Sequence, residues 1–169
     1  MATQIEWKKK FFSDTYTLFA DGIGIGVLKS KSLSGNGVGE YRGKNFDFIT
    51  AGFFKQNTWI SNKSQDGVLA NIKFDMWRTK AEIIYLGKKY IWKTESAWST
   101  TMSISCDDRM LLKMSGSSTK GVIEIFGEED EMLILACLFL INYYWQIFAA
   151  AMVAVFVPTI TNLSRVLSE

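Results

Sequence analysis

An uncharged stretch of 26 residues, from Met132 to Val157, constrains the fold more than any other feature of the chain. It follows the acidic segment EEDE, and apolar residues occupy most of the circumference of the helix that it predicts. A helix without a polar face is buried either in protein or in lipid. At about 1.5 Å per residue the stretch would be roughly 39 Å long, which is enough to cross the ~30 Å core of a bilayer. The sequence before it has to indicate which of the two hosts surrounds the helix.

The residues before this stretch show the period-two alternation that is typical of half-buried strands. Ile72, Phe74 and Met76, for example, alternate with polar residues, and turn-forming segments such as SQDG and LGKK separate successive runs. The pattern predicts about twelve strands. They are expected near residues 4–10, 15–20, 23–30, 38–42, 45–50, 56–61, 67–76, 79–86, 89–96, 99–106, 109–115 and 120–126.

Twelve consecutive antiparallel strands favour a closed barrel, because closure removes the unpaired edges of a sheet. A barrel of that size is too wide for its own side chains to fill, so either an apolar segment occupies its axis or a cavity or aqueous channel remains inside. The apolar stretch is the only segment of suitable length and character for the axis. We therefore predict a mainly β protein, an antiparallel closed barrel of about twelve strands around a C-terminal hydrophobic α-helix at about residues 129–157. The prediction is one domain over residues 1–157 and a short tail over 158–169. An open two-sheet sandwich is the alternative.

Two amides within the apolar stretch favour burial in protein. Asn142 and Gln146 are four residues apart and share one face of a helix. Inward hydroxyls or backbone groups of a barrel could bond them, whereas in lipid they would need partners from another helix. The host of residues 146–157 stays open between the barrel, a membrane and an oligomer interface.

The composition argues against most catalytic, metal-binding and nucleic-acid functions. The chain has no histidine, and 19 basic residues against 17 acidic residues do not make the strong positive field of a dedicated nucleic-acid binder. Cys106 and Cys137 lack metal-ligand spacing and are predicted to be free thiols. GIGIG at Gly22–Gly26 lacks the third glycine of a nucleotide loop and is predicted to be a strand with closely packed glycines. We expect no enzyme activity, no catalytic residues, no metal and no cofactor.

Three segments resemble the tubby C-terminal-like superfamily, which includes tubby-like proteins, LURP-one-related proteins and phospholipid scramblases. They are DGVLANIKFDMW (Asp66–Trp77), AEIIYLGKKYIWK (Ala81–Lys93) and GVIEIFGEEDEMLILACLFLINYYW (Gly121–Trp145). The resemblance implies a twelve-stranded barrel around a central C-terminal helix. It also implies that Lys and Arg on the barrel surface hold anionic phosphoinositide headgroups. The apolar stretch is longer than a barrel core needs, which departs from the family's pattern.

Short lysine clusters at predicted strand ends and hairpin tips are the strongest functional signal. They are Lys8–Lys10, Lys29 with Lys31, Arg78 with Lys80, and Lys88 with Lys89. Among them we predict that Lys88 and Lys89 bind lipid headgroups, because a hairpin tip can reach a surface. A role in solubility and in preventing edge pairing is the competing interpretation.

Three functions therefore stay open. The first is a tubby-like barrel that binds anionic phospholipid or a membrane surface as a scaffold, without nucleic acid and with unknown protein partners. The second is a tail-anchored membrane protein with a cytoplasmic β-domain, since only Arg165 among the basic residues follows the helix. The third is a barrel that carries a small apolar ligand, with the helix outside. The N-terminus lacks the pattern of a secretory signal, so a cytoplasmic location is expected, with membrane association through the helix.

Overall fold

The computed structural model describes residues 3–31, 35–51, 57–64, 66–75, 79–95, 100–146 and 149. Twelve β-strands account for most of them. Their bounds are β1 Thr3–Lys9, β2 Thr15–Ala20, β3 Ile23–Lys31, β4 Asn36–Tyr41, β5 Lys44–Ala51, β6 Asn57–Asn62, β7 Val68–Phe74, β8 Lys80–Tyr85, β9 Lys88–Thr94, β10 Met102–Cys106, β11 Arg109–Gly116 and β12 Lys120–Ile125. Each corresponds to one predicted strand, and the largest difference is at β10, which was expected from residue 99.

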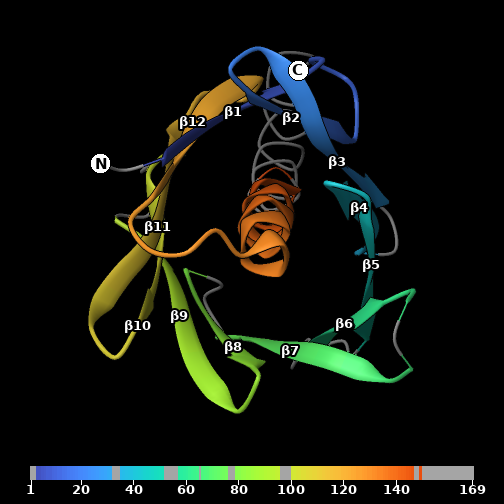
Figure 1. Ribbon diagram of the computed structural model, residues 1–169, viewed down its shortest axis with the longest axis vertical. Helices are drawn as coiled ribbons and strands as arrows, with labels where there is room; N and C mark the ends of the chain where they lie inside the picture. The colour runs from blue at the N-terminus through green and yellow to red at the C-terminus, as the bar shows by residue number, and fades with distance from the viewer. Residues whose placement is uncertain are drawn as a thin grey trace, which may run out of the picture.

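The strands form one closed antiparallel barrel, as predicted (Figure 1). Every strand pairs with the next one along the chain, and β1 closes the barrel by pairing with β12 over the register Thr3↔Ile125 to Lys8↔Lys120. The alternative of an open two-sheet sandwich is wrong, because this closing pair leaves the sheet no free edge.

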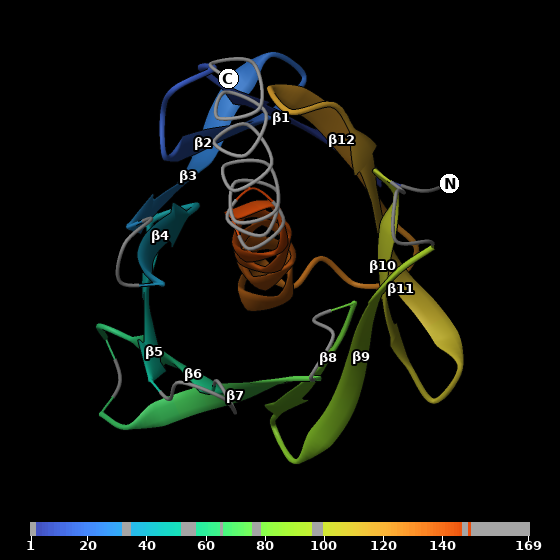
Figure 2. The same cartoon turned by 180° about the vertical axis from the view of Figure 1, so that it is seen from behind.

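The C-terminal helix runs along the inside of the barrel, where Figures 1 and 2 show it surrounded by strands. It is described over residues 131–146, and Ala149 is also helical. Every residue from Met132 to Tyr144 is buried, at 9% exposure or less, so all sides of the helix face the barrel wall. This arrangement explains the apolar circumference of the helix. No helix in the described part of the chain has the length and apolar character needed to cross a membrane.

The structure therefore describes only part of the predicted helix and none of the predicted tail. The helix begins at residue 131 rather than at 129, because residues 126–130 form the connection from β12. Apart from Gln146 and Ala149, the stretch whose host was left open lies outside the described residues, as does the predicted tail over 158–169.

A row of glycines lets the helix approach β4 closely. A Cβ atom on Gly39 would lie 2.9 Å from Leu135 Cδ1, and one on Gly37 would lie 3.3 Å from Phe139 Cδ2. Two residues of a strand span about 6.7 Å and four residues of a helix span about 6 Å. The spacing of Gly37 and Gly39 along β4 therefore matches the spacing of Phe139 and Leu135 along the helix. Phe139 also stacks on Phe48 with ring centroids 4.7 Å apart. The glycines thus provide room for large helix side chains.

Buried hydroxyls of the barrel satisfy the amide of Asn142. The Tyr16 hydroxyl donates to Asn142 Oδ1 at 3.1 Å, and Asn142 Nδ2 donates to Ser30 Oγ at 2.7 Å. This confirms the prediction that inward hydroxyls meet this side chain. Gln146 differs, because its buried Nε2 has no hydrogen-bond partner among the described residues.

Candidate functional site

The antiparallel order divides the turns between two ends of the barrel. Turns after odd-numbered strands lie at one end, and turns after even-numbered strands lie at the other, together with the connection over residues 126–130 and the first helical residue, Glu131. We call the first the lysine end and the second the carboxylate end. Each end comprises its turns and the three adjoining residues of every strand.

The two ends differ in the sign of their charge. Among described residues the lysine end carries Lys8, Lys9, Lys10, Lys29, Lys31, Lys73, Lys80, Lys93 and Lys120, against Asp14, Asp75, Glu82 and Glu95. The carboxylate end carries Asp21, Glu40, Asp66, Asp107, Asp108, Glu124, Glu128, Glu129, Asp130 and Glu131, against Arg42, Lys44, Lys63, Lys88, Lys89 and Arg109. The barrel is therefore polarised along its axis.

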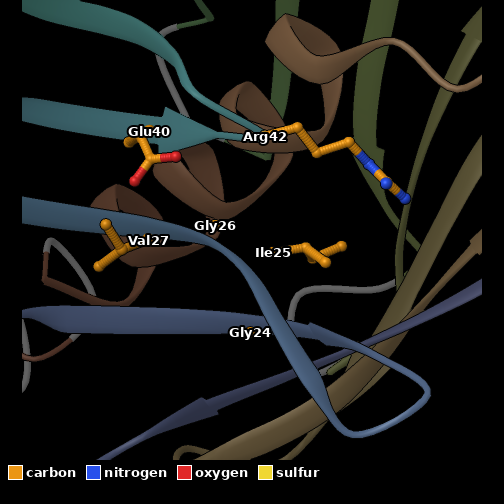
Figure 3. Close-up of a pocket in the computed structure, with 6 residues that line it drawn as sticks. All are labelled: Gly24, Ile25, Gly26, Val27, Glu40 and Arg42. Atoms are coloured by element: carbon orange, nitrogen blue, oxygen red, sulfur yellow. The ribbon is translucent and has the colours of Figure 1, made fainter.

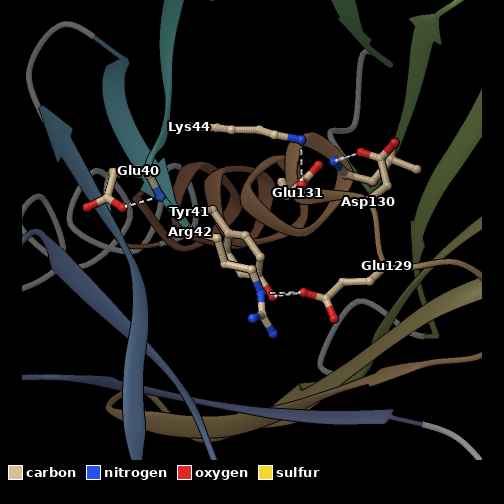
Figure 4. A network of polar contacts seen from close by, with 9 residues as sticks. Glu40, Tyr41, Arg42, Lys44, Glu129, Asp130 and Glu131 are labelled. Atoms are coloured by element: carbon tan, nitrogen blue, oxygen red, sulfur yellow. Dashed lines mark hydrogen bonds and ion pairs between the residues drawn. The ribbon is translucent and has the colours of Figure 1, made fainter.

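Acidic residues at the carboxylate end anchor the start of the helix (Figure 4). Glu129 accepts hydrogen bonds from the Tyr41 hydroxyl at 2.6 Å and from Arg42 Nε at 2.9 Å. Lys44 Nζ donates to Glu131 at 2.7 Å. Asp130 caps the helix, since its Oδ1 accepts from the backbone N–H of Leu133 at 2.9 Å. These carboxylates join the helix to the β4–β5 hairpin.

Two phenols at this end, the buried Tyr41 and the half-buried Tyr85, are held in the neutral form. Burial and the charge of Asp130 raise the pKa of Tyr85 to about 12. Burial and the hydrogen bond to Glu129 likewise raise the pKa of Tyr41. Burial also raises the pKa of Asp130 itself. A neutral phenol donates a hydrogen bond to a carboxylate, so these groups act as structural donors.

A pocket of about 420 Å³ lies near the carboxylate end, across β3 and β4 (Figure 3). Both of its charged side chains already have partners. Arg42 is paired with Glu129, and Glu40 accepts from the backbone N–H of Gly43 at 2.9 Å. Gly26 packs against the Glu40 carbonyl, as predicted for the GIGIG segment, whereas a Cβ on Gly24 would touch nothing within 4 Å. This pocket therefore lies over the glycines of β3, and both charged side chains that line it are already bonded within the protein.

Lys88 and Lys89 also lie at the carboxylate end, where β9 begins after the β8–β9 turn. Lys89 Nζ forms an ion pair with Glu82 Oε1 at 2.5 Å on the adjoining strand. Both lysines stand at the opposite end of the barrel from Lys8–Lys10. The structure therefore separates the two residues chosen from the sequence from most of the other lysine clusters.

The remaining clusters converge at the lysine end. Lys8–Lys10 end β1, Lys29 and Lys31 end β3, and Lys80 begins β8, while Arg78 lies outside the described residues. Lys9 Nζ lies 5.0 Å from the centre of the Tyr16 ring, and burial lowers the pKa of Lys9. Lysine side chains from separate hairpins thus gather around one opening of the barrel.

Sequence reasoning missed two aromatic residues at the tip of the β1–β2 hairpin. Phe11 is 69% exposed and Phe12 is 96% exposed, and their rings meet edge to face with centroids 4.8 Å apart. They directly follow Lys8–Lys10 in the segment KKKFF. The available signal was a pair of large aromatics in a turn, where the strand alternation offers them no buried position.

Metal-ligand clusters and thiols were two kinds of site that the sequence left to the described residues. No group of three or more His, Cys, Asp or Glu residues among them could hold a metal ion. Both cysteines are free, and burial raises the pKa of Cys137 to about 12, which disfavours the reactive thiolate.

Comparisons with protein-family models, with curated proteins and with solved structures find no match to this chain.

Proposed function

We propose that this protein is a non-enzymatic barrel of the tubby-like kind that binds anionic membrane surfaces through its lysine end. The observation that carries the proposal is the β1–β2 hairpin, where Phe11 and Phe12 are exposed next to three consecutive lysines. Aromatic side chains that enter the headgroup region and lysines that meet anionic lipid form a familiar pair of membrane-binding signals.

The expected energies suit reversible binding. Each lysine near an anionic surface contributes about 1 kcal/mol, and burial of an exposed Phe contributes about 1.5–3 kcal/mol. The lysine end therefore replaces Lys88 and Lys89 as the proposed headgroup-binding region, because it combines positive charge from several hairpins with exposed aromatics.

A tail anchor stays as the second candidate, and one observation favours it. The described helix ends at the lysine end, and the uncharged sequence IFAAAMVAVFV over residues 147–157 comes next in the chain. An anchor that begins there would place the same end against the membrane. The third candidate required a helix outside the barrel, and the helix lies inside it.

Vesicle cosedimentation tests the proposal and separates it from the tail anchor. The full chain should bind vesicles that contain phosphatidylserine at low salt and should not bind pure phosphatidylcholine vesicles. Raising the salt should release it, because ions screen surface charges. A tail-anchored chain would stay on the vesicles in high salt, which would overturn peripheral binding in favour of the second candidate.

A matched pair of charge reversals tests which end binds. Lys10→Glu with Lys80→Glu changes the lysine end by four charges and should weaken binding by at least ~100-fold. Lys88→Glu with Lys89→Glu makes the same change at the carboxylate end and should alter binding less than ~3-fold. Equal losses from the two pairs would overturn the assignment to the lysine end.

A further inference from the structure

The outer face of the barrel carries a row of exposed apolar side chains across β5 to β8. In the strand register, Ile49 lies opposite Trp59, Trp59 lies opposite Asn71, and Asn71 lies opposite Ile84. Ile49, Trp59 and Ile84 are 53%, 38% and 39% exposed. The Asn71 amide donates to the Thr58 carbonyl at 3.4 Å, within the sheet. The row is therefore a largely apolar patch, which is typical of a protein-binding surface.

Charged residues of β7 and β8 border this patch on the side of the lysine end. Lys73 is the register partner of Glu82. One row further along, the backbone N–H of Asp75 donates to the carbonyl of Lys80. Each row thus holds one base and one acid, and the two strands carry opposite signs at each level. We call the apolar row and these four charged residues the β7–β8 face.

The charges of this face do not neutralise one another. Within the described residues, no ion pair joins Lys73 to Glu82 or Lys80 to Asp75. Glu82 pairs with Lys89 on β9 instead. Asp75 Oδ1 is buried and has no hydrogen-bond partner in the same part of the chain. Because a buried carboxylate oxygen without a partner is unfavourable, a cation from outside the chain would stabilise it.

A hollow of about 290 Å³ lies over these four charged residues. Its volume is at the lower limit of sites for small ligands, which begin at about 300 Å³. Its lining carries charges of both signs. A hollow of this size and character suits the side chains of another protein surface better than a separate ligand.

A second copy of the chain matches this face by symmetry. A twofold axis parallel to the strands, midway between β7 and β8, places each residue of β7 against the residue of β8 at the same level in the other copy. Lys73 then meets the partner's Glu82, and Glu82 meets the partner's Lys73. The row of Asp75 and Lys80 repeats this match, so a lysine of the partner approaches the unpaired Oδ1. The apolar rows of the two copies cover each other.

We propose that the β7–β8 face binds a second copy of this chain and forms an isologous homodimer. A face of one sign would repel its own copy, whereas the alternating signs of this face make it self-complementary. Because the axis runs along the strands, both barrels present their lysine ends on the same side of the dimer. The dimer goes beyond the proposed membrane binding and does not depend on it.

Sedimentation velocity of the full chain tests the proposal. The face is small, so a dissociation constant on the order of 10 μM is expected, and samples from about 1 to 300 μM should pass from monomer to dimer. Lys73→Glu sets two acids against each other across the axis, and Glu82→Lys sets two bases against each other. Each variant alone should therefore dimerise at least ~10-fold more weakly. An equimolar mixture of the two variants should dimerise again, within about threefold of the wild-type affinity, because opposite charges then meet at both contacts.

A matched control and three contrary outcomes define the test. Lys120→Glu makes the same charge change on β12, across the barrel from β7 (Figure 1), and should leave the dimer unchanged. A wild-type chain that stays monomeric at about 300 μM would overturn the proposal. A dimer that survives both reversals would place the interface elsewhere, and a mixture that stays monomeric would contradict the twofold pairing. None of these samples contains lipid, so the proposed membrane binding stands or fails separately.

Discussion

The two ends of the barrel expose similar apolar side chains but differ in charge. Ile23 and Leu86 at the carboxylate end are 69% and 71% exposed, which is comparable to Phe11 at the lysine end. Exposed apolar tips therefore do not distinguish the ends. The carboxylate end uses many of its charges within the protein, where Glu129 and Glu131 hold the β4–β5 hairpin. The lysine end directs an excess of positive charge outward, and this difference indicates which end meets an anionic surface.

The largest expected effect concerns the helix, which connects the two ends. A chain truncated after Gly127 lacks the buried helix residues, so the barrel loses its core and should not fold. Near-ultraviolet circular dichroism and thermal unfolding would measure the loss as the absence of a cooperative transition. A truncated chain that unfolds cooperatively would contradict the account of the helix as the core.

Placing a side chain at a glycine of β4 should destabilise the protein less than the truncation does, but by a measurable amount. Gly39→Val places a branched side chain against Leu135, which should lower the free energy of unfolding by about 1–3 kcal/mol. Gly24→Val is the matched control, because a Cβ there meets nothing within 4 Å, and its effect should stay within about 0.5 kcal/mol. Urea unfolding of both variants checks the prediction, and equal effects would refute the close helix contact.

Removing an aromatic tip should affect membrane binding without affecting stability. Phe12→Ala should weaken binding to anionic vesicles about tenfold, or ~1.4 kcal/mol, because the ring no longer enters the headgroup region. Its unfolding midpoint should not change, since Phe12 is 96% exposed. Leu86→Ala removes an exposed apolar tip at the carboxylate end and should leave binding unchanged. An equal loss of binding from Leu86→Ala would show that the two ends do not differ in membrane binding and would contradict the proposal.

The smallest effect is a change in alkaline stability at the carboxylate end. Folding raises the pKa of Tyr85 from an ordinary value near 10 to about 12, so the folded state retains a proton that the unfolded state loses. The stabilisation is complete below pH 10 and is lost as the pH rises toward about 12. Tyr85→Phe should therefore show a shallower decline in unfolding free energy over this window. Parallel declines in the two proteins would show that Tyr85 does not contribute.

Much of the fold could be predicted from local patterns. Alternation identified all twelve strands, and the uncharged helix implied an enclosing wall. The end at which each lysine lies was also within reach, because turns after odd-numbered strands share one end of an antiparallel barrel. That rule places Lys88 and Lys89 after an even-numbered strand, away from Lys8–Lys10.

The pairing that closes the barrel was beyond such reasoning. β1 pairs with β12, which brings Lys8 beside Lys120 and Trp7 beside Gly121 although these residues lie far apart in the sequence. No local pattern specifies the register of a pair so distant in sequence, since the hydrophobic alternation of each strand fixes only which side chains face inward.

The most direct test of the central claim is the orientation of the barrel on a membrane. An environment-sensitive NBD label would be attached to Phe12→Cys at the lysine end or to Leu86→Cys at the carboxylate end, each with Cys106→Ser to leave one accessible thiol. With phosphatidylserine vesicles, the label at residue 12 should shift its emission to the blue and brighten, because it enters the headgroup region, while the label at residue 86 should not respond. A response at residue 86 alone, or at neither residue, would contradict the proposed binding through the lysine end.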